Sequence, residues 1–216
     1  KAAGGTALKS FTKLKPLIEK LFSTNQFHFT QHKGHATDIA SQLSQGSCQH
    51  LIAVGGDGTL NEVISGLFKS RQNLSPSFTL GTLPLGTGSD FIKALKLPRD
   101  PKKALKVLAQ NHTVSVDVGQ LQIQNLKHQS FEHYFINSAS CGLSAEVAYQ
   151  VNQSTKWAGP LFTYAQKSLA GIWAYQPMQV SVYKNQTPLY EGDLAAVVLA
   201  NGTHFGGGMH VAPHAR

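Results

Sequence analysis

The sequence predicts an α/β domain built on a parallel sheet, followed by a β-rich second domain. Two observations carry this prediction. Up to about residue 111, short apolar runs typical of strands alternate with stretches whose apolar residues recur at helical spacing. From Thr113 onward, strand-like segments dominate, and helical spacing returns only near 143–150 and 160–175. We therefore divide the chain into an α/β domain, 1–112, and a β-rich domain, 113–216.

Each element of the first domain follows from its pattern of apolar residues. Leu60, Val63, Ile64, Leu67 and Phe68, for example, have the spacing of one buried helix face. The same reasoning predicts, in order, helix 14–22, strand 27–31, helix 35–43, strand 50–54, helix 60–68, strand 78–83 and helices 91–95 and 101–108.

In the second domain, four segments have strand character and two have helical character. The predicted order is strands 113–118 and 133–139, helices 143–150 and 160–175, and strands 178–183 and 194–201.

The composition limits the class of protein. Hydrophobic residues make up 41% of the 216-residue chain, which also contains 20 Gly, so that disorder, collagen and coiled coil are excluded. The longest apolar run, Leu194–Ala200, is too short for a membrane-spanning helix, which needs about 20 residues. The net charge of +8 favours anionic partners such as nucleotide phosphates, nucleic acid or an acidic membrane.

A glycine loop follows the predicted strand 50–54. The chain passes through Gly55 and Gly56 and enters a helix after Asp57 and Gly58. Glycines allow a ligand to approach the backbone closely, and a helix N-terminus offers unpaired N–H groups and a partial positive charge. This combination is typical of a phosphate-binding loop at the carboxyl edge of a parallel sheet.

The loop has a simpler reading as well. Thr59 and Glu62 have the spacing of a capping box, which would only hold the helix end. That reading leaves Asp57 unexplained, because a carboxylate in an anion-binding loop repels phosphate unless a cation lies between them. Asp57 therefore indicates Mg²⁺ bridging the carboxylate and a nucleotide.

A second loop of the same design follows strand 78–83. It contains Gly86, Thr87 and Gly88, and Thr87 and Asp90 again have capping-box spacing. The two loops are about thirty residues apart, as expected for one strand–helix–strand step. Two adjacent strands could thus direct two loops at one ligand.

Together, the segments 55–62 and 86–90 resemble the diacylglycerol kinase catalytic domain, in the bacterial lipid kinase branch related to sphingosine and ceramide kinases. Ordered motifs along most of the chain extend the resemblance: Thr30 before Gly34-His35-Ala36, Asp117-Val118-Gly119, the segment 135–147, Asn201-Gly202 and the glycine-rich run 205–209. Two positions depart from the family pattern, which commonly has Asn at Ser89 and Arg at Lys93.

The resemblance implies an N-terminal domain related to those of NAD kinase and phosphofructokinase and a β-sandwich second domain that is incomplete at its C-terminus. It implies ATP- and Mg²⁺-dependent transfer of the γ-phosphoryl group to a lipid hydroxyl such as that of diacylglycerol. Asp57 is then the metal ligand and the catalytic carboxylate within the chain, while the main base is expected beyond Arg216. The residues implied to contact the nucleotide are Thr30, Gly55, Gly56, Asp57, Gly58, Thr59, Leu60, Asn61, Gly86 and Thr87.

Two alternatives stay open at this point. One keeps the fold but phosphorylates a soluble acceptor, as NAD kinase does; the other is a nucleotide- or lipid-binding protein without catalysis. For the first reading, the expected partners are ATP and a lipid at the membrane surface, without nucleic acid. A homodimer is left open, and the expected location is the cytoplasm, peripheral to the membrane.

Overall fold

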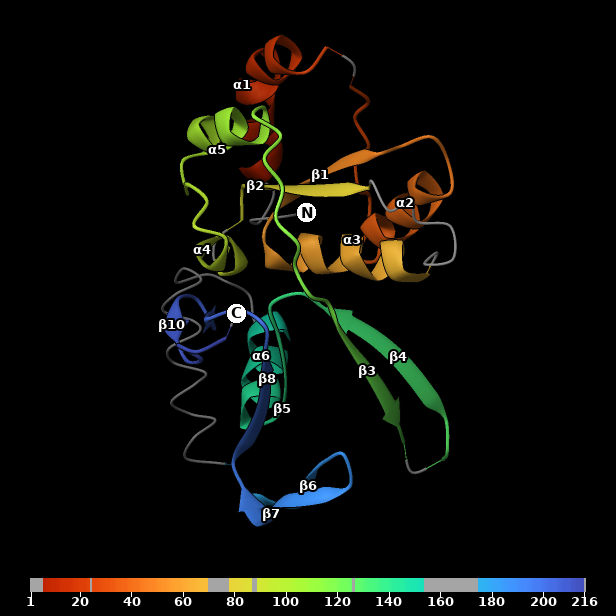
Figure 1. Cartoon of the computed structure of the whole chain (residues 1–216), viewed down its shortest axis with the longest axis vertical. Helices are drawn as coiled ribbons and strands as arrows, with labels where there is room; N and C mark the ends of the chain where they lie inside the picture. Colours follow the sequence, from red (N-terminus) through yellow and green to blue (C-terminus); the bar gives the residue numbers. More distant parts are fainter. Residues whose placement is uncertain are drawn as a thin grey trace. The chain divides into compact units, whose positions relative to one another are not determined.

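The computed structural model describes residues 6–23, 25–69, 78–86, 89–125, 127–153 and 175–215. The chain divides into two compact units (Figure 1). The first unit comprises Lys1–Asn137 together with Asn201–Arg216, and the second comprises Ser138–Ala200. The predicted domain boundary between residues 112 and 113 stays a prediction.

The first unit is built on two parallel strands. β1 (His50–Gly55) pairs with β2 (Thr79–Pro84) in a register that runs from His50 opposite Thr79 to Gly55 opposite Pro84. Both strands are rich in apolar side chains that are buried or half-buried, as expected where helices cover both faces. This arrangement confirms the predicted α/β class with a parallel sheet.

Helices cover the strand pair on opposite sides (Figure 1). On one side, α1 (Thr6–Leu21) and α5 (Pro101–Leu108) share a core that includes Phe11, Leu14, Leu83 and Leu105. On the other side, α2 (His35–Ser44) and α3 (Asp57–Lys69) share a core that includes Ala40, Ala53, Leu60 and Ile64. The helical stripes read from the sequence are therefore the faces that pack on the sheet. α4 (Phe91–Ala94), predicted as 91–95, is a single turn.

Two predicted strands of the first unit are wrong. Residues 25–31 and 112–118 have no strand pairing in the structure. The aromatic residues of the first segment pack instead: the rings of Phe27 and Phe29 meet Phe11 edge-on, at centroid distances of 5.3 and 5.6 Å. In the second segment Val114 is 75% exposed, so its apolar alternation does not face a core. A hairpin follows, β3 (Gly119–Gln124) with β4 (Ser130–Phe135), of which the sequence predicted only the end of β4.

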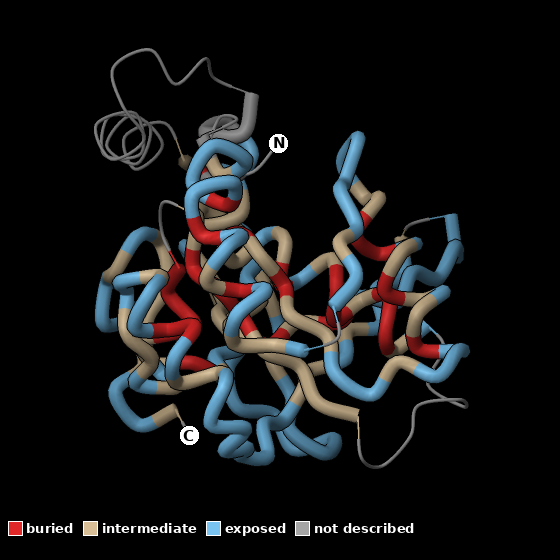
Figure 2. The backbone as a smooth tube through the Cα atoms, turned by 90° about the horizontal axis from the view of Figure 1, so that it is seen from above, coloured by how far each residue is buried: buried red, intermediate tan, exposed pale blue. Residues whose placement is uncertain are grey.

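The second unit contains one helix and two described antiparallel strand pairs. β5 (Ser138–Gly142) pairs with β8 (Ala196–Ala200), and β6 (Met178–Lys184) pairs with β7 (Thr187–Leu194). The predicted helix near 143–150 is confirmed as α6 (Leu143–Gln153). The predicted helix 160–175 lies almost wholly outside the described residues. Of the buried apolar side chains described, only Val147 belongs to this unit. Figure 2 colours the backbone by the burial of each residue.

The last segment of the chain returns to the first unit. The carbonyl of Asn137 accepts the N–H groups of Asn201 and Gly202, each at 2.8 Å. The Asn201 side-chain amide donates to the carbonyls of Asp117 and Ile136, both at 2.7 Å. A short hairpin, β9 (His204–Phe205) with β10 (Met209–His210), follows this anchor. Among the described residues, no helix has the length and apolar character needed to cross a membrane.

The packing of α2 against α3 depends on Gly66. A Cβ at this position would overlap the carbonyl oxygen of Thr37 and lie 2.9 Å from the Cβ of Ala40. We expect Gly66→Ala to lower the free energy of unfolding by about 2–3 kcal/mol, because backbone atoms cannot yield as a flexible side chain can. Urea unfolding checks this value. Ser65→Ala, at the neighbouring half-buried position, should change stability by less than about 1 kcal/mol; equal losses in the two variants would contradict the packing argument.

Candidate functional site

The two glycine loops touch each other backbone to backbone. The carbonyl of Gly55 accepts the N–H groups of Leu85 and Gly86, at 2.9 and 3.1 Å. A Cβ at Gly86 would overlap the backbone of Gly56, and a Cβ at Gly56 would lie 3.1 Å from the Gly86 Cα. Glycine is therefore required at 86 for the loops to meet, whatever ligand they bind, and a side chain at 56 would have to push the second loop away by a few tenths of an ångström.

Asp57 joins the first loop to the helix that follows the second. Its Oδ2 accepts the N–H of Asp90 at 2.8 Å, and its Oδ1 accepts the N–H of Phe91 at 3.2 Å. These two N–H groups stand at the start of α4, where no intrahelical acceptor exists for them. The Asp57 carboxylate thus caps α4 from a position 33 residues earlier in the sequence. This contact gives Asp57 a structural role, which the capping-box reading of the sequence did not provide.

The N-terminus of α3 is the part of the first loop that is open to a ligand. The helix begins at Asp57, and its first intrahelical bond runs from the Leu60 N–H to the Gly56 carbonyl, at 3.1 Å. The N–H groups of Asp57, Gly58 and Thr59 therefore precede the hydrogen-bonded ladder. Gly58 is exposed, and a Cβ there would meet no atom within 4 Å. Neither packing nor an unusual φ requires a glycine at 58, in contrast to 86.

The alternative reading of Thr59 and Glu62 as a capping box is wrong. The helix starts two residues before Thr59, and the Thr59 hydroxyl packs against Gly55. Glu62 Oε2 instead accepts the N–H of Ala36 at 3.3 Å, and the Thr37 hydroxyl donates to the Glu62 carbonyl at 3.0 Å. Glu62 therefore caps the neighbouring helix α2, because α2 brings its own unpaired N–H group within reach.

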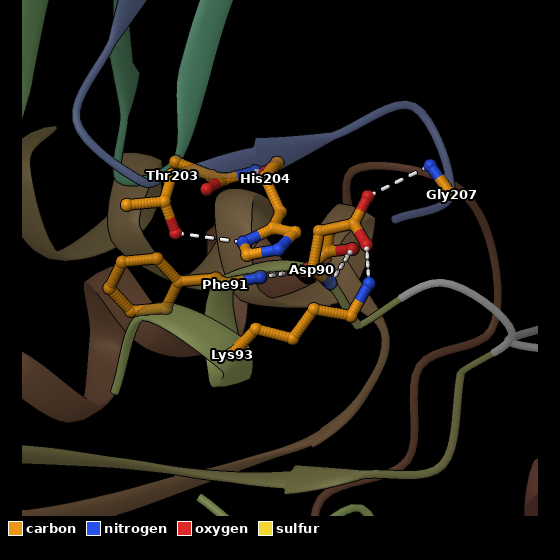
Figure 3. Close-up of polar contacts among 8 residues, drawn as sticks. Asp90, Phe91, Lys93, Thr203, His204 and Gly207 are labelled. Carbon is orange, nitrogen blue, oxygen red and sulfur yellow. Dashed lines mark hydrogen bonds and ion pairs between the residues drawn. The ribbon is translucent and has the colours of Figure 1, made fainter. Parts of the chain in front are cut away.

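Asp90 connects the second loop to the C-terminal hairpin (Figure 3). Asp90 is 4% exposed, and its Oδ1 accepts the ammonium group of Lys93 at 2.8 Å. Its other oxygen accepts the N–H of Gly207 at 2.9 Å. A Cβ at Gly208 would lie 2.7 Å from Lys93 Nζ, so the turn at 206–208 sits directly against this pair. We call Asp90, Lys93 and Gly207 the latch.

Neighbouring side chains hold the hairpin of the latch in shape. The Thr203 hydroxyl lies 2.8 Å from His204 Nδ1 (Figure 3). The rings of His204 and His210 stack at a centroid distance of 4.6 Å. Asn137 donates its amide to the His204 carbonyl at 2.9 Å. Glycines at 206–208 all have positive φ, which a tight turn over Lys93 requires. Sequence reasoning noted this glycine run but did not connect it to Asp90.

The remaining predicted site residues lie in different surroundings. Thr30 is exposed in the irregular segment before α2 and has no hydrogen bond to the described parts of either loop. Leu60 is 3% exposed in the core beneath α3, and Asn61 is exposed on the same helix. Thr87 lies outside the described residues. Ser89 is buried with φ +49°, and its hydroxyl has no hydrogen-bond partner among the described residues.

Comparison with known proteins fixes the family. The model of the diacylglycerol kinase catalytic domain matches residues 1–121. The chain belongs to this family. A second model, described as a YegS C-terminal NAD kinase beta sandwich-like domain, matches residues 137–216. The predicted family and the predicted order of an α/β domain and a β-sandwich domain are therefore confirmed.

Similar proteins carry lipid kinase names. "Diacylglycerol kinase" of Staphylococcus carnosus is 31% identical over 201 residues, which is 92% of this chain and 60% of that protein. "Probable lipid kinase YegS-like" of Chromohalobacter salexigens is 32% identical over 191 residues, 87% of this chain and 56% of that protein. A crystal structure of a diacylglycerol kinase from Bacillus anthracis has a TM-score of 0.63 at 23% identity, covering 93% of this chain and 61% of that one, and shows the same fold. This member of the diacylglycerol kinase family thus spans about three fifths of the relatives it matches.

The latch predicts a specific stability effect. Lys93→Ala leaves the buried Asp90 carboxylate with the Gly207 N–H as its remaining latch partner, so the free energy of unfolding should fall by about 2 kcal/mol. Lys93→Arg keeps the charge and should recover most of that loss. Lys102→Ala removes an exposed lysine of α5 and should change stability by less than about 0.5 kcal/mol. Chemical unfolding of the three variants checks the order; equal stability of Lys93→Ala and Lys102→Ala would contradict the latch.

Proposed function

We propose that this chain is the nucleotide-binding part of an ATP- and Mg²⁺-dependent lipid kinase that phosphorylates a lipid hydroxyl such as that of diacylglycerol. Membership of the diacylglycerol kinase catalytic domain family supports the reaction class, and the names of the relatives support the lipid acceptor. The observation that carries the proposal for this chain is the open backbone at Gly58, beside the N-terminus of α3.

The residues of the first loop fit a nucleotide phosphate. The N–H groups of Asp57, Gly58 and Thr59 stand at the positive end of a 13-residue helix, where anions are stabilised. The missing side chain at Gly58 leaves the backbone accessible, since a Cβ there would meet no atom of the described residues within 4 Å. Gly55, Gly56 and Gly86 contribute indirectly, because the contact between them holds the first loop in the conformation that exposes these N–H groups. Thr30, Asn61 and Thr87 stay proposed nucleotide contacts from the family resemblance.

Asp57 fits a hard cation as a single carboxylate ligand. Each of its oxygens accepts one N–H bond, and a carboxylate oxygen has two lone pairs, so one on each oxygen is left. Mg²⁺ in phosphoryl-transfer sites is commonly held by one or two carboxylates together with substrate phosphates. The described residues contain no group of three or more His, Cys, Asp or Glu side chains that could hold a metal alone. When bound, Mg²⁺ neutralises negative charge on the phosphates.

The lipid acceptor sets the proposed location. A kinase for a lipid hydroxyl has to reach a bilayer, so we place the protein in the cytoplasm, peripheral to the membrane, with ATP and lipid as its partners. Following the family resemblance, we propose that the main base accepting the hydroxyl proton lies beyond Arg216.

Gly58→Ala tests the phosphate loop without disturbing the fold. We expect the affinity of the full chain for Mg-ATP to fall at least about tenfold, because the methyl group occupies the approach to the backbone N–H groups. Stability should be unchanged or slightly higher, since alanine favours helix more than glycine does. Calorimetric titration and thermal unfolding give both values. The matched control is Gly46→Ala, whose Cβ meets only the Leu43 carbonyl oxygen, at 3.7 Å; affinity lost equally in both variants would refute the assignment.

Asp57→Ala tests the catalytic assignment. In the full-length protein, ATP consumption with diacylglycerol-containing vesicles should be abolished while the fold persists. Unfolding should become easier by about 1–3 kcal/mol, because the N–H groups of Asp90 and Phe91 lose their acceptor. Circular dichroism at the assay temperature separates the two effects. Turnover at the wild-type rate in a folded Asp57→Ala variant would overturn the assignment.

A further inference from the structure

The net positive charge of the chain is concentrated in two segments of the first unit. Residues 6–21 and 91–108, which hold α1, α4 and α5, contain ten of the 19 basic residues and two of the 11 acidic ones. Their net charge of +8 equals that of the whole chain, and the remaining residues hold nine charges of each sign. The net positive charge of the whole chain is therefore carried by these two segments.

These basic side chains point to solvent. Apart from Lys93, which belongs to the latch, every one of them is exposed. On α1 the lysines at 9, 13 and 20 are spaced four and seven residues apart, and therefore lie along one side of the helix. On α5, Lys106 lies three and four residues after Lys103 and Lys102, so these lysines share one side of the helix, away from the buried Ala104 and Leu105. We call these six lysines the basic face.

The two helices that carry the basic face belong to one layer. α1 and α5 share the core around Phe11, Leu14 and Leu105, on the same side of the β1–β2 pair (Figure 1). The first glycine loop bonds through Asp57 to the start of α4, and the two loops contact each other, so no lysine of the basic face takes part in these contacts. The face is thus available for a second anionic partner while a nucleotide is bound.

We infer that the basic face docks the protein on the anionic surface of a lipid bilayer. Nine of the ten basic residues in the segments 6–21 and 91–108 are lysines, which act as hydrated point charges and attract a diffuse negative surface without the paired hydrogen bonds of arginine. α1 and α5 themselves carry no exposed ring on which a nucleic-acid base could stack, because Phe11 is buried and α5 has no aromatic residue; the exposed Phe29 beside them has its ring packed edge-on against Phe11. Among anionic partners, a bilayer therefore fits better than RNA or DNA. The inference rests on the proposed function only for its choice of a lipid surface.

Vesicle binding of the full chain tests the inference without ATP. The probes are vesicles of phosphatidylcholine alone and vesicles that also contain about 30% phosphatidylglycerol, at low and high salt. The test variant combines Lys9→Gln, Lys13→Gln, Lys102→Gln and Lys106→Gln. The matched control combines Lys33→Gln, Lys69→Gln, Lys127→Gln and Lys184→Gln, four exposed lysines elsewhere in the chain. Both variants lower the net charge from +8 to +4.

The wild-type chain should bind the anionic vesicles, bind the neutral ones at least about tenfold more weakly, and lose affinity as salt is raised. The test variant should lose at least about tenfold in affinity for anionic vesicles, and the control variant less than about twofold. The inference would be overturned by equal losses of affinity in both variants, or by equal affinity for neutral and anionic vesicles. Tighter binding to a DNA duplex than to the anionic vesicles would overturn it as well. Mg-ATP affinity, measured in the same samples, should be equal in all three proteins, so a failure of the nucleotide assignment is seen separately.

Discussion

The contact between Gly56 and Gly86 is the constraint on which the rest of the first unit's site depends. The parallel strands β1 and β2 end at the same edge, and the chain segments that leave them touch at Gly56 and Gly86, where a Cβ on Gly86 would overlap the Gly56 backbone. With glycine at both positions, the Gly55 carbonyl can accept two N–H groups from the second loop. The Asp57 carboxylate can then reach the start of α4. α4 in turn carries Asp90 and Lys93 to the C-terminal hairpin.

One carboxylate therefore serves two purposes. Asp57 stabilises the fold by accepting two N–H groups, and the same carboxylate is the proposed ligand of a cation. The two purposes are compatible, because hydrogen bonds from N–H groups fix the direction of the carboxylate and leave lone pairs for a hard ion. They also mean that loss of activity on changing Asp57 carries information only when stability is measured beside it.

The sequence predicted those features that depend on neighbouring residues. Helical spacing located α1, α2, α3 and α5, and compact apolar runs located β1 and β2, because their side chains enter a core. β3 was missed because its alternating glutamines are exposed, and its strand form comes from pairing with β4. The capping box at Thr59 failed for a related reason, since the partner of Glu62 is a backbone group of α2. The bond of Asp90 to Gly207 joins residues 117 positions apart, a separation at which local patterns carry no signal.

The positions of the charged residues separate the proposed nucleotide site from the proposed membrane-binding surface, which the net charge alone does not distinguish. Around the glycine loops, Lys93 is the one cationic side chain described in 55–62 and 89–94, and it is paired with Asp90. Asp57 and Glu62 make the same segments net negative. Phosphates held there would rely on backbone N–H groups and on an added cation, which is the physical reason for proposing Mg²⁺ beside Asp57. The lysines of the basic face are then free of any part in nucleotide binding. Their positive field reaches about 10 Å into solvent, the range over which a charged bilayer attracts a protein.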